Sequence, residues 1–135
     1  MKSTLTFRVI YRDTDAEGVV YYANYLAWLE AGRTELIRTL GFSLTELKKK
    51  HNLVFAVKDI FCEYFSPAVY DDEIIVETRI GELKPVRVIF EQKILRKSDS
   101  KVLAGAKVTA IPIDIKSFKP IRIPENLKNK ILKAI

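Results

Sequence analysis

The sequence contains few of the residues on which most metal and nucleophilic sites depend. Its 135 residues include a single cysteine, Cys62, and a single histidine, His51. One cysteine cannot form a disulfide within the chain, and a Cys-rich zinc site needs further thiols. Because His51 follows three lysines, we expect it to lie on the surface, and we expect Cys62 to be a small core residue. The composition therefore disfavours structural zinc, thiol redox chemistry and histidine-dependent hydrolysis.

Long apolar runs and low-complexity segments are also missing. No stretch approaches the roughly 18 apolar residues of a membrane-spanning helix, and the first residues are polar where a signal peptide is apolar. The hydrophobic fraction of 48% nevertheless suffices for one core in a chain of 135 residues. We therefore expect a single domain over residues 1–135, located in the cytoplasm and without a membrane span.

Charge and composition add two weaker indications. Residues 84–135 contain 13 Lys and Arg but only 4 Asp and Glu, a net charge of +9. Such a block attracts anions, but charge alone does not distinguish nucleic acid, a membrane surface, a phosphate-bearing cofactor or an ordinary solvated surface. The chain has one Cys and one Met but many Lys, Glu, Arg and Ile, which is typical of proteins from hot environments. A thermophilic origin is our hypothesis.

The apolar periodicity predicts helices as well as strands. A two-residue alternation over residues 3–11 is typical of a half-buried strand, whereas residues 22–40 have the spacing of a long helix that ends at Gly41. Ser43 and Glu46 have the spacing of a capping box, which predicts a second helix over residues 43–50. A final short helix, residues 125–133, follows Pro124.

Between the second and the last helix the chain is rich in Val, Ile, Phe and Tyr. Turn sequences divide this region into four predicted strands, at residues 53–65, 73–83, 86–96 and 102–115. Short connections favour antiparallel pairing. The order of elements predicts an α+β domain in which an antiparallel sheet of about five strands packs against one long helix. The two open edges of such a sheet favour dimerisation through the sheet.

The long helix is expected to pack on this sheet through its apolar side. That side includes Tyr25, Trp28 and Leu29. Glu30 and Arg33 lie three residues apart on the helix and could pair with each other. A glutamate in a dimer interface could instead contact the acyl group, so the role of Glu30 stays unassigned.

The segment between the first strand and the long helix is unusually acidic. Asp13, Asp15 and Glu17 occur within five residues and are followed by Gly18. Their spacing matches the first half of an EF-hand calcium loop, but the twelfth position is Asn24 instead of Glu, so calcium binding is disfavoured. The structural alternative is a turn in which the Asp side chains accept backbone hydrogen bonds.

The start of the long helix gives this acidic loop a chemical interpretation. The first backbone amides of a helix have no partner within the helix and carry a partial positive charge. Near Tyr22 they could polarise a carbonyl group, while a carboxylate of the loop acts as nucleophile or as general base on water. Together these groups form a minimal hydrolytic site that requires neither histidine nor serine.

Residues 11–25, YRDTDAEGVVYYANY, and residues 28–35, WLEAGRTE, resemble the active-site segment of hotdog-fold acyl-CoA thioesterases of the 4-hydroxybenzoyl-CoA thioesterase and YbgC type. Residues 63–72, 88–92 and 113–124 are also similar to segments of that family. The resemblance implies the hotdog fold, an antiparallel sheet wrapped around a long central helix. It further implies a homodimer, commonly a dimer of dimers (a homotetramer), with active sites at the dimer interface.

The same resemblance implies roles for individual residues of the acidic loop. The catalytic carboxylate falls on Asp15, and the backbone amide that polarises the thioester carbonyl falls on Tyr22. Asp13 and Gly18 fall on supporting positions. Many YbgC-like members have histidine where this chain has Tyr22, and a second glycine where it has Glu17.

Coenzyme A carries phosphates, and the basic part of the chain offers contacts for them. By resemblance, Lys84 and Arg87 are the candidates that bind these phosphates, followed by Lys119 and Arg122. Coenzyme A is part of the substrate, so no further cofactor and no metal ion are implied.

We therefore predict an enzyme that hydrolyses an acyl-CoA or acyl-carrier-protein thioester to a free acid and a thiol. One alternative is a hotdog protein that binds acyl-CoA without catalysis. A nucleic-acid-binding domain that uses the basic carboxyl-terminal part is disfavoured, because no nucleic-acid-binding motif is recognisable. A dehydratase is disfavoured because such sites usually use histidine and His51 is poorly placed. The acyl group and the choice between dimer and tetramer stay open.

Overall fold

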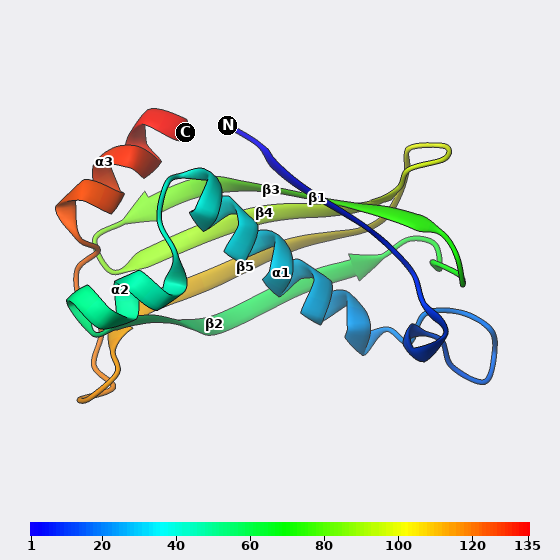
Figure 1. Ribbon diagram of the computed structural model, residues 1–135, viewed down its shortest axis with the longest axis horizontal. Coiled ribbons are helices and arrows are strands. Elements are labelled where there is room, and N and C mark those ends of the chain that lie inside the picture. The colour runs from blue at the N-terminus through cyan, green and yellow to red at the C-terminus, as the bar shows by residue number, and fades with distance from the viewer.

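The computed structural model describes all 135 residues (Figure 1). In chain order the elements are β1 (Ser3–Arg8), the 3-10 turn η1 (Tyr11–Asp13), α1 (Ala23–Thr39), α2 (Leu44–His51), β2 (Leu53–Tyr64), β3 (Glu73–Lys84), β4 (Arg87–Arg96), β5 (Lys101–Asp114) and α3 (Glu125–Ala134). Every strand and every α-helix that the sequence predicts is present, with bounds within three residues of the predicted ones.

The five strands form one antiparallel sheet in the order β1-β3-β4-β5-β2. The long helix α1 crosses one face of this sheet, and α2 and α3 lie toward the end that contains the β3–β4 turn (Figure 1). The open edges are β1 and β2. This arrangement confirms the predicted α+β architecture. None of the helices is long and apolar enough to span a membrane.

The core lies between the sheet and the helices, with α1 covering most of it and α2 and α3 adding Leu47, Leu127 and Ile131. In β3, alternate residues such as Ile74 and Val76 are fully buried, as the two-residue period of a strand requires. The predicted packing of Tyr25, Trp28 and Leu29 is confirmed, since all three are buried. Burial of one large apolar side chain stabilises the fold by about 2 kcal/mol, so α1 is held mainly by its apolar side.

The predicted helix ends are also confirmed. Gly41, directly after α1, has a φ of +92°, a conformation that glycine adopts without strain. The side chain of Ser43 accepts a hydrogen bond from the backbone N–H of Glu46 at 3.1 Å and so caps α2.

One strand end differs from the prediction, and Cys62 is less buried than predicted. β1 ends at Arg8 rather than at residue 11, because the carboxylate of Asp13 accepts the Ile10 N–H at 3.0 Å and the chain turns into η1. Cys62 packs against the core but stays partly exposed, because β2 is an edge strand.

A buried glutamine attaches α1 to the sheet. Gln92 is 3% exposed, and its Nε2 donates to the Leu29 carbonyl at 2.8 Å and to Thr78 Oγ1 at 2.9 Å. Its Oε1 accepts a hydrogen bond from Arg33 at 3.0 Å. Arg33 therefore turns toward β4 and does not form the possible ion pair with Glu30.

Next to this glutamine, α1 comes so close to the sheet that only glycine fits. A Cβ on Gly32 would lie 2.7 Å from both Thr78 Oγ1 and Val76 Cγ1, and 3.1 Å from Gln92 Nε2. These distances are shorter than van der Waals contact, so the helix or the strands would have to move.

We expect Gly32→Ala to lower the free energy of unfolding by about 1–3 kcal/mol through overpacking. This loss should appear although alanine favours an isolated helix by about 1 kcal/mol. Urea unfolding measures it, and Ala31→Gly at the exposed neighbouring position isolates the propensity effect. A more stable Gly32→Ala variant would contradict the close approach.

Candidate active site

The acidic loop between β1 and α1 is fixed by its own hydrogen bonds. The Asp15 N–H donates to the Val19 carbonyl at 2.8 Å, and the Gly18 N–H donates to the Asp15 carbonyl at 3.1 Å. Oδ1 of Asp15 accepts the Glu17 N–H at 2.8 Å. Gly18 has a φ of +82°, which this turn requires. Asp15 is thus exposed and oriented, and its second carboxylate oxygen accepts no hydrogen bond within the chain.

Asp13 has a different role in the same loop. Its side chain accepts the Ile10 N–H, and its backbone carbonyl accepts hydrogen bonds from the Tyr21 N–H at 2.9 Å and from Asn24 Nδ2 at 2.8 Å. These contacts tie the beginning of the loop to the beginning of α1. Both the side chain and the backbone carbonyl of Asp13 therefore accept hydrogen bonds that stabilise the loop.

The start of α1 has two free backbone donors. The Asn24 N–H donates to the Tyr21 carbonyl, and the Tyr25 N–H donates to the Tyr22 carbonyl. The backbone amides of Tyr22 and Ala23 donate no hydrogen bond within the chain. Free amides at a helix start carry the positive end of the helix dipole. An oxygen that develops negative charge would be stabilised there.

A second segment, between β2 and β3, supports the loop from the side. The Val20 N–H donates to the Ala68 carbonyl at 2.9 Å, and the Ala68 N–H donates to the hydroxyl of Tyr25 at 2.9 Å. Tyr25 is 3% exposed, and burial raises the pKa of its phenol, so the hydroxyl stays protonated. Ala68 thus connects the loop to the first turn of α1.

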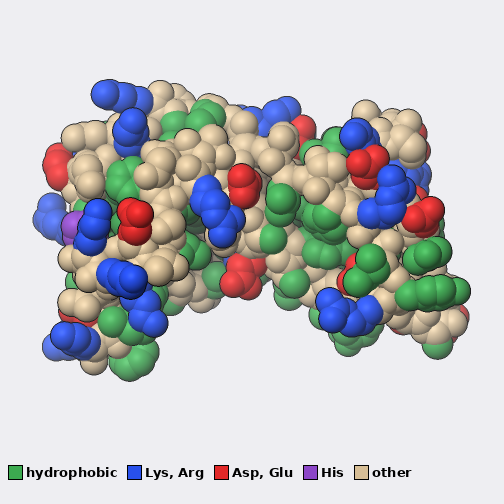
Figure 2. All heavy atoms as spheres, viewed as in Figure 1, with side chains coloured by type: hydrophobic (Ala, Val, Ile, Leu, Met, Phe, Trp, Pro, Cys, Tyr) green, Lys and Arg blue, Asp and Glu red, His purple; other side chains and the backbone are tan.

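Tyrosine side chains surround this helix start. The ring of Tyr64, the last residue of β2, lies edge-on to the rings of Tyr22 and Tyr25, with centroid distances of 6.3 Å and 5.2 Å. Hydrophobic side chains also gather at this end of the molecule on the face seen in Figure 2. Aromatic rings therefore lie beside the start of α1, where the free amides are, even though the side chain of Tyr22 itself is 62% exposed.

The predicted phosphate contacts lie elsewhere in the chain. Lys84 and Arg87 flank the β3–β4 turn, whereas the acidic loop lies near the start of β3 (Figure 1). With a rise of roughly 3.3 Å per residue, the length of β3 separates the two by about 36 Å. Asp13, Asp15, Gly18 and Tyr22 therefore lie in the one segment between β1 and α1, whereas Lys84 and Arg87 lie at the other end of the sheet.

A basic cavity lies beside the β3–β4 turn. Its volume is about 240 Å³, and its lining includes Lys84, Arg122 and Lys128 together with the acidic Glu125. Three cationic residues from β3, α3 and the segment before α3 thus line one cavity that could hold phosphate groups.

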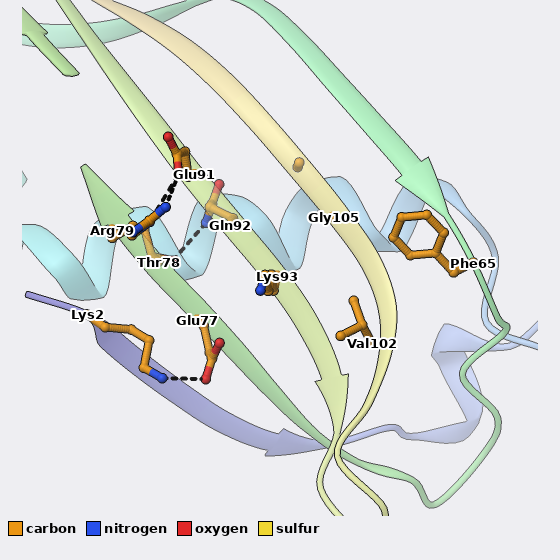
Figure 3. Close-up of a pocket in the computed structure, with 11 residues that line it drawn as sticks. Lys2, Phe65, Glu77, Thr78, Arg79, Glu91, Gln92, Lys93, Val102 and Gly105 are labelled. Atoms are coloured by element: carbon orange, nitrogen blue, oxygen red, sulfur yellow. Dashed lines mark hydrogen bonds and ion pairs between the residues drawn. The ribbon is translucent and has the colours of Figure 1, made fainter. Parts of the chain in front are cut away.

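The largest cavity, about 530 Å³, lies on the sheet face turned away from α1 (Figure 3). Ion pairs between Lys2 and Glu77 and between Arg79 and Glu91 line it. Its lining includes no residue of the acidic loop. No group of three or more His, Cys, Asp or Glu side chains is arranged to hold a metal ion.

Sequence reasoning located the loop and the helix start but missed the residues that hold them. Ala68 and Tyr64 lie more than 40 residues along the chain from the helix residues that they contact. Local periodicity carries no signal for such contacts. Only the resemblance of residues 63–72 to the thioesterase family pointed to this segment.

The family model of the thioesterase-like superfamily matches residues 9–131. The chain is 40% identical over 121 residues to the acyl-CoA thioesterase YbgC of Haemophilus influenzae, covering 90% of this chain and 88% of that protein.

Solved structures agree with the sequence comparison. A probable thioesterase from Bartonella henselae superimposes with a TM-score of 0.87 at 35% identity, over 92% of this chain and 100% of that one. The DHNA-CoA thioesterase of Staphylococcus aureus superimposes with a TM-score of 0.92 at 25% identity, over 98% and 89% of the two chains.

Proposed function

The chain belongs to the thioesterase-like superfamily and is an acyl-CoA thioesterase, and we propose that Asp15 and the Tyr22 amide carry out the hydrolysis. The observation that best supports these roles is the pairing, within one rigid loop, of a carboxylate with an unbonded oxygen and a free helix-start amide.

In the proposed reaction the thioester carbonyl accepts a hydrogen bond from the Tyr22 amide. That contact stabilises the negative charge on the oxygen as the carbonyl carbon becomes tetrahedral. Asp15 either attacks this carbon, so that the C–S bond breaks and water then hydrolyses the mixed anhydride, or takes a proton from an attacking water. Both routes convert one thioester and one water into one carboxylic acid and one thiol.

The hydrogen bonds favour Asp15 over Asp13 as the reacting carboxylate. Asp13 uses its side chain to accept the Ile10 N–H and thereby holds η1 in place. Asp15 uses only Oδ1, for the Glu17 N–H, so Oδ2 can reach a substrate. Asp13 and Gly18 are proposed to support the loop.

We expect Asp15→Asn to lower kcat by about 10²- to 10⁴-fold, because the amide is neither a nucleophile nor a base. The assay is thiol release from acetyl-, butyryl-, palmitoyl- and benzoyl-CoA, which also identifies the acyl group. Glu17→Gln removes a neighbouring carboxylate and should leave the rate unchanged.

Full activity of Asp15→Asn would contradict the assigned role. A native protein that binds these esters without releasing thiol would indicate a carrier-protein substrate or the non-catalytic alternative.

A proline substitution can test the Tyr22 amide directly. Tyr22 has a φ of −57°, close to the angle that proline fixes, and its N–H is unpaired. Tyr22→Pro therefore removes the proposed donor, and we expect a kcat about 10²- to 10³-fold below that of Tyr22→Ala, which keeps the N–H. Equal rates in the two variants, both with native circular dichroism spectra, would rule out the amide.

A homodimer would complete the site. The edge strand β2 exposes apolar side chains, including Val57 at 47% and Phe61 at 65%, as an edge that pairs with a second copy does. A two-fold axis across β2 would reverse the second sheet, so that the partner's β3–β4 turn lies at the same end as the acidic loop. Lys84 and Arg87 of the partner subunit are then proposed to bind the phosphates of coenzyme A.

We expect Lys84→Ala and Arg87→Ala to raise KM for acyl-CoA several-fold without a large change in kcat, because they remove charge from the phosphate contacts. The matched substrate is an acyl-N-acetylcysteamine thioester, which has no phosphates. The KM for this thioester should be the same in the two variants as in the native protein. An equal rise in KM for both substrates would contradict phosphate binding.

Several further properties stay predictions. They are the association of two dimers into a tetramer, a location in the cytoplasm, a thermophilic origin, and a reaction without any cofactor besides the coenzyme A of the substrate. Light scattering after size exclusion tests the tetramer, and the thermal unfolding midpoint tests the thermophilic origin.

A further inference from the structure

The peptide group between Tyr22 and Ala23 is held on one side and free on the other. Its carbonyl oxygen accepts the Tyr25 N–H at 3.2 Å and the hydroxyl of Tyr64 at 3.4 Å. Its N–H belongs to Ala23 and donates no hydrogen bond within the chain. This free donor is adjacent to the Tyr22 amide that the proposed mechanism uses.

Tyr64 reaches this peptide group from a rigid position. It is the last residue of β2 and pairs with Ala104 of β5, and the next residue, Phe65, donates its N–H to the Leu103 carbonyl at 2.8 Å. Its ring stands nearly perpendicular to the rings of Tyr22 and Tyr25, with interplanar angles of 80° and 77°. The pairing of β2 with β5, and not the acidic loop, therefore fixes the position of the hydroxyl.

A hydrogen bond to a carbonyl polarises the N–H of the same peptide group, because the two dipoles are coupled through the amide resonance. The Tyr64 bond therefore makes the Ala23 N–H a stronger donor. A distance of 3.4 Å is long for an O–H···O bond. Hydrogen bonds in a catalytic site are often long in the free protein and tighten in the transition-state complex, so the contact can stabilise the transition state more than the bound substrate.

The Tyr64 hydroxyl remains a donor throughout the usual assay range. Burial and the neighbouring Cys62 thiol raise the pKa of the phenol to about 12. Between pH 6 and pH 9 it therefore stays protonated and does not titrate.

We propose that Tyr64 is a positioning residue, which holds and polarises the Tyr22–Ala23 peptide so that the Ala23 amide acts as a second donor to the thioester oxyanion. This inference rests on the proposed function of the helix start. It adds a donor to the site and gives the end of β2 a role in catalysis.

The test compares Tyr64→Phe with Tyr70→Phe. Tyr64→Phe keeps the ring but loses the hydroxyl, and we expect kcat to fall about three- to tenfold while KM stays within twofold. Tyr70 is half exposed, stacks on Tyr11 and makes no hydrogen bond through its hydroxyl. Tyr70→Phe should therefore match the native protein in both constants. Both variants should keep the native unfolding midpoint.

The outcomes separate this inference from the proposed function. An unchanged kcat in Tyr64→Phe, with activity that still depends on Asp15, would overturn the role of Tyr64 alone. A lower unfolding midpoint with unchanged kcat would show a structural role only.

The pH profiles of kcat for Tyr64→Phe and the native protein should be parallel between pH 6 and pH 9. A limb lost from the profile of the variant would make Tyr64 an acid or base instead. A native protein without thioesterase activity would refute the proposed function itself.

Discussion

A helix cannot satisfy its own first backbone amides, and the site described here depends on that constraint. At α2 the problem is solved locally, because the Ser43 side chain caps the Glu46 amide. At α1 the amides of Tyr22 and Ala23 stay free, which leaves this helix start less stable than a capped one. The stability of α1 therefore has to come from the packing of its buried residues against the sheet and from the Gln92 bond to Leu29.

Leaving the helix start uncapped also requires that other segments fix its position. Asp13 does so from the loop, through its backbone carbonyl, and Ala68 does so from the β2–β3 connection. Tyr64 adds a contact from the end of the sheet. Because these supports come from three places in the chain, the free amides keep a fixed direction without a side-chain hydrogen bond to either of them. Such preorganisation is what electrostatic stabilisation of a transition state requires.

Much of this arrangement could be predicted from the sequence, because it is periodic or local. The long helix followed from the spacing of its apolar residues, and the acidic loop from the three carboxylates before it. The failures have physical causes. The alternation of apolar residues continues past Arg8, but one hydrogen bond from Ile10 to Asp13 ends the strand. Helical spacing suggested that Arg33 pairs with Glu30, yet its partner is Gln92, 59 residues away. Periodicity does not encode contacts across the fold.

The distribution of charge can be compared with the proposed two-fold dimer. Three carboxylates lie in the loop at one end of the sheet, whereas the basic cavity with Lys84 lies at the other end. The loop repels an anionic coenzyme, so the phosphates need a basic surface near the reacting carbonyl but outside the loop. Within one chain that surface is about 36 Å away, a distance set by the length of β3. In the proposed two-fold dimer the separation becomes an advantage, because reversing the second sheet places its basic end at the same end of the dimer as the acidic loop of the first chain. In that dimer the open edge at β2 would form the interface, and Lys84 would lie at the end of the dimer that holds the partner's acidic loop.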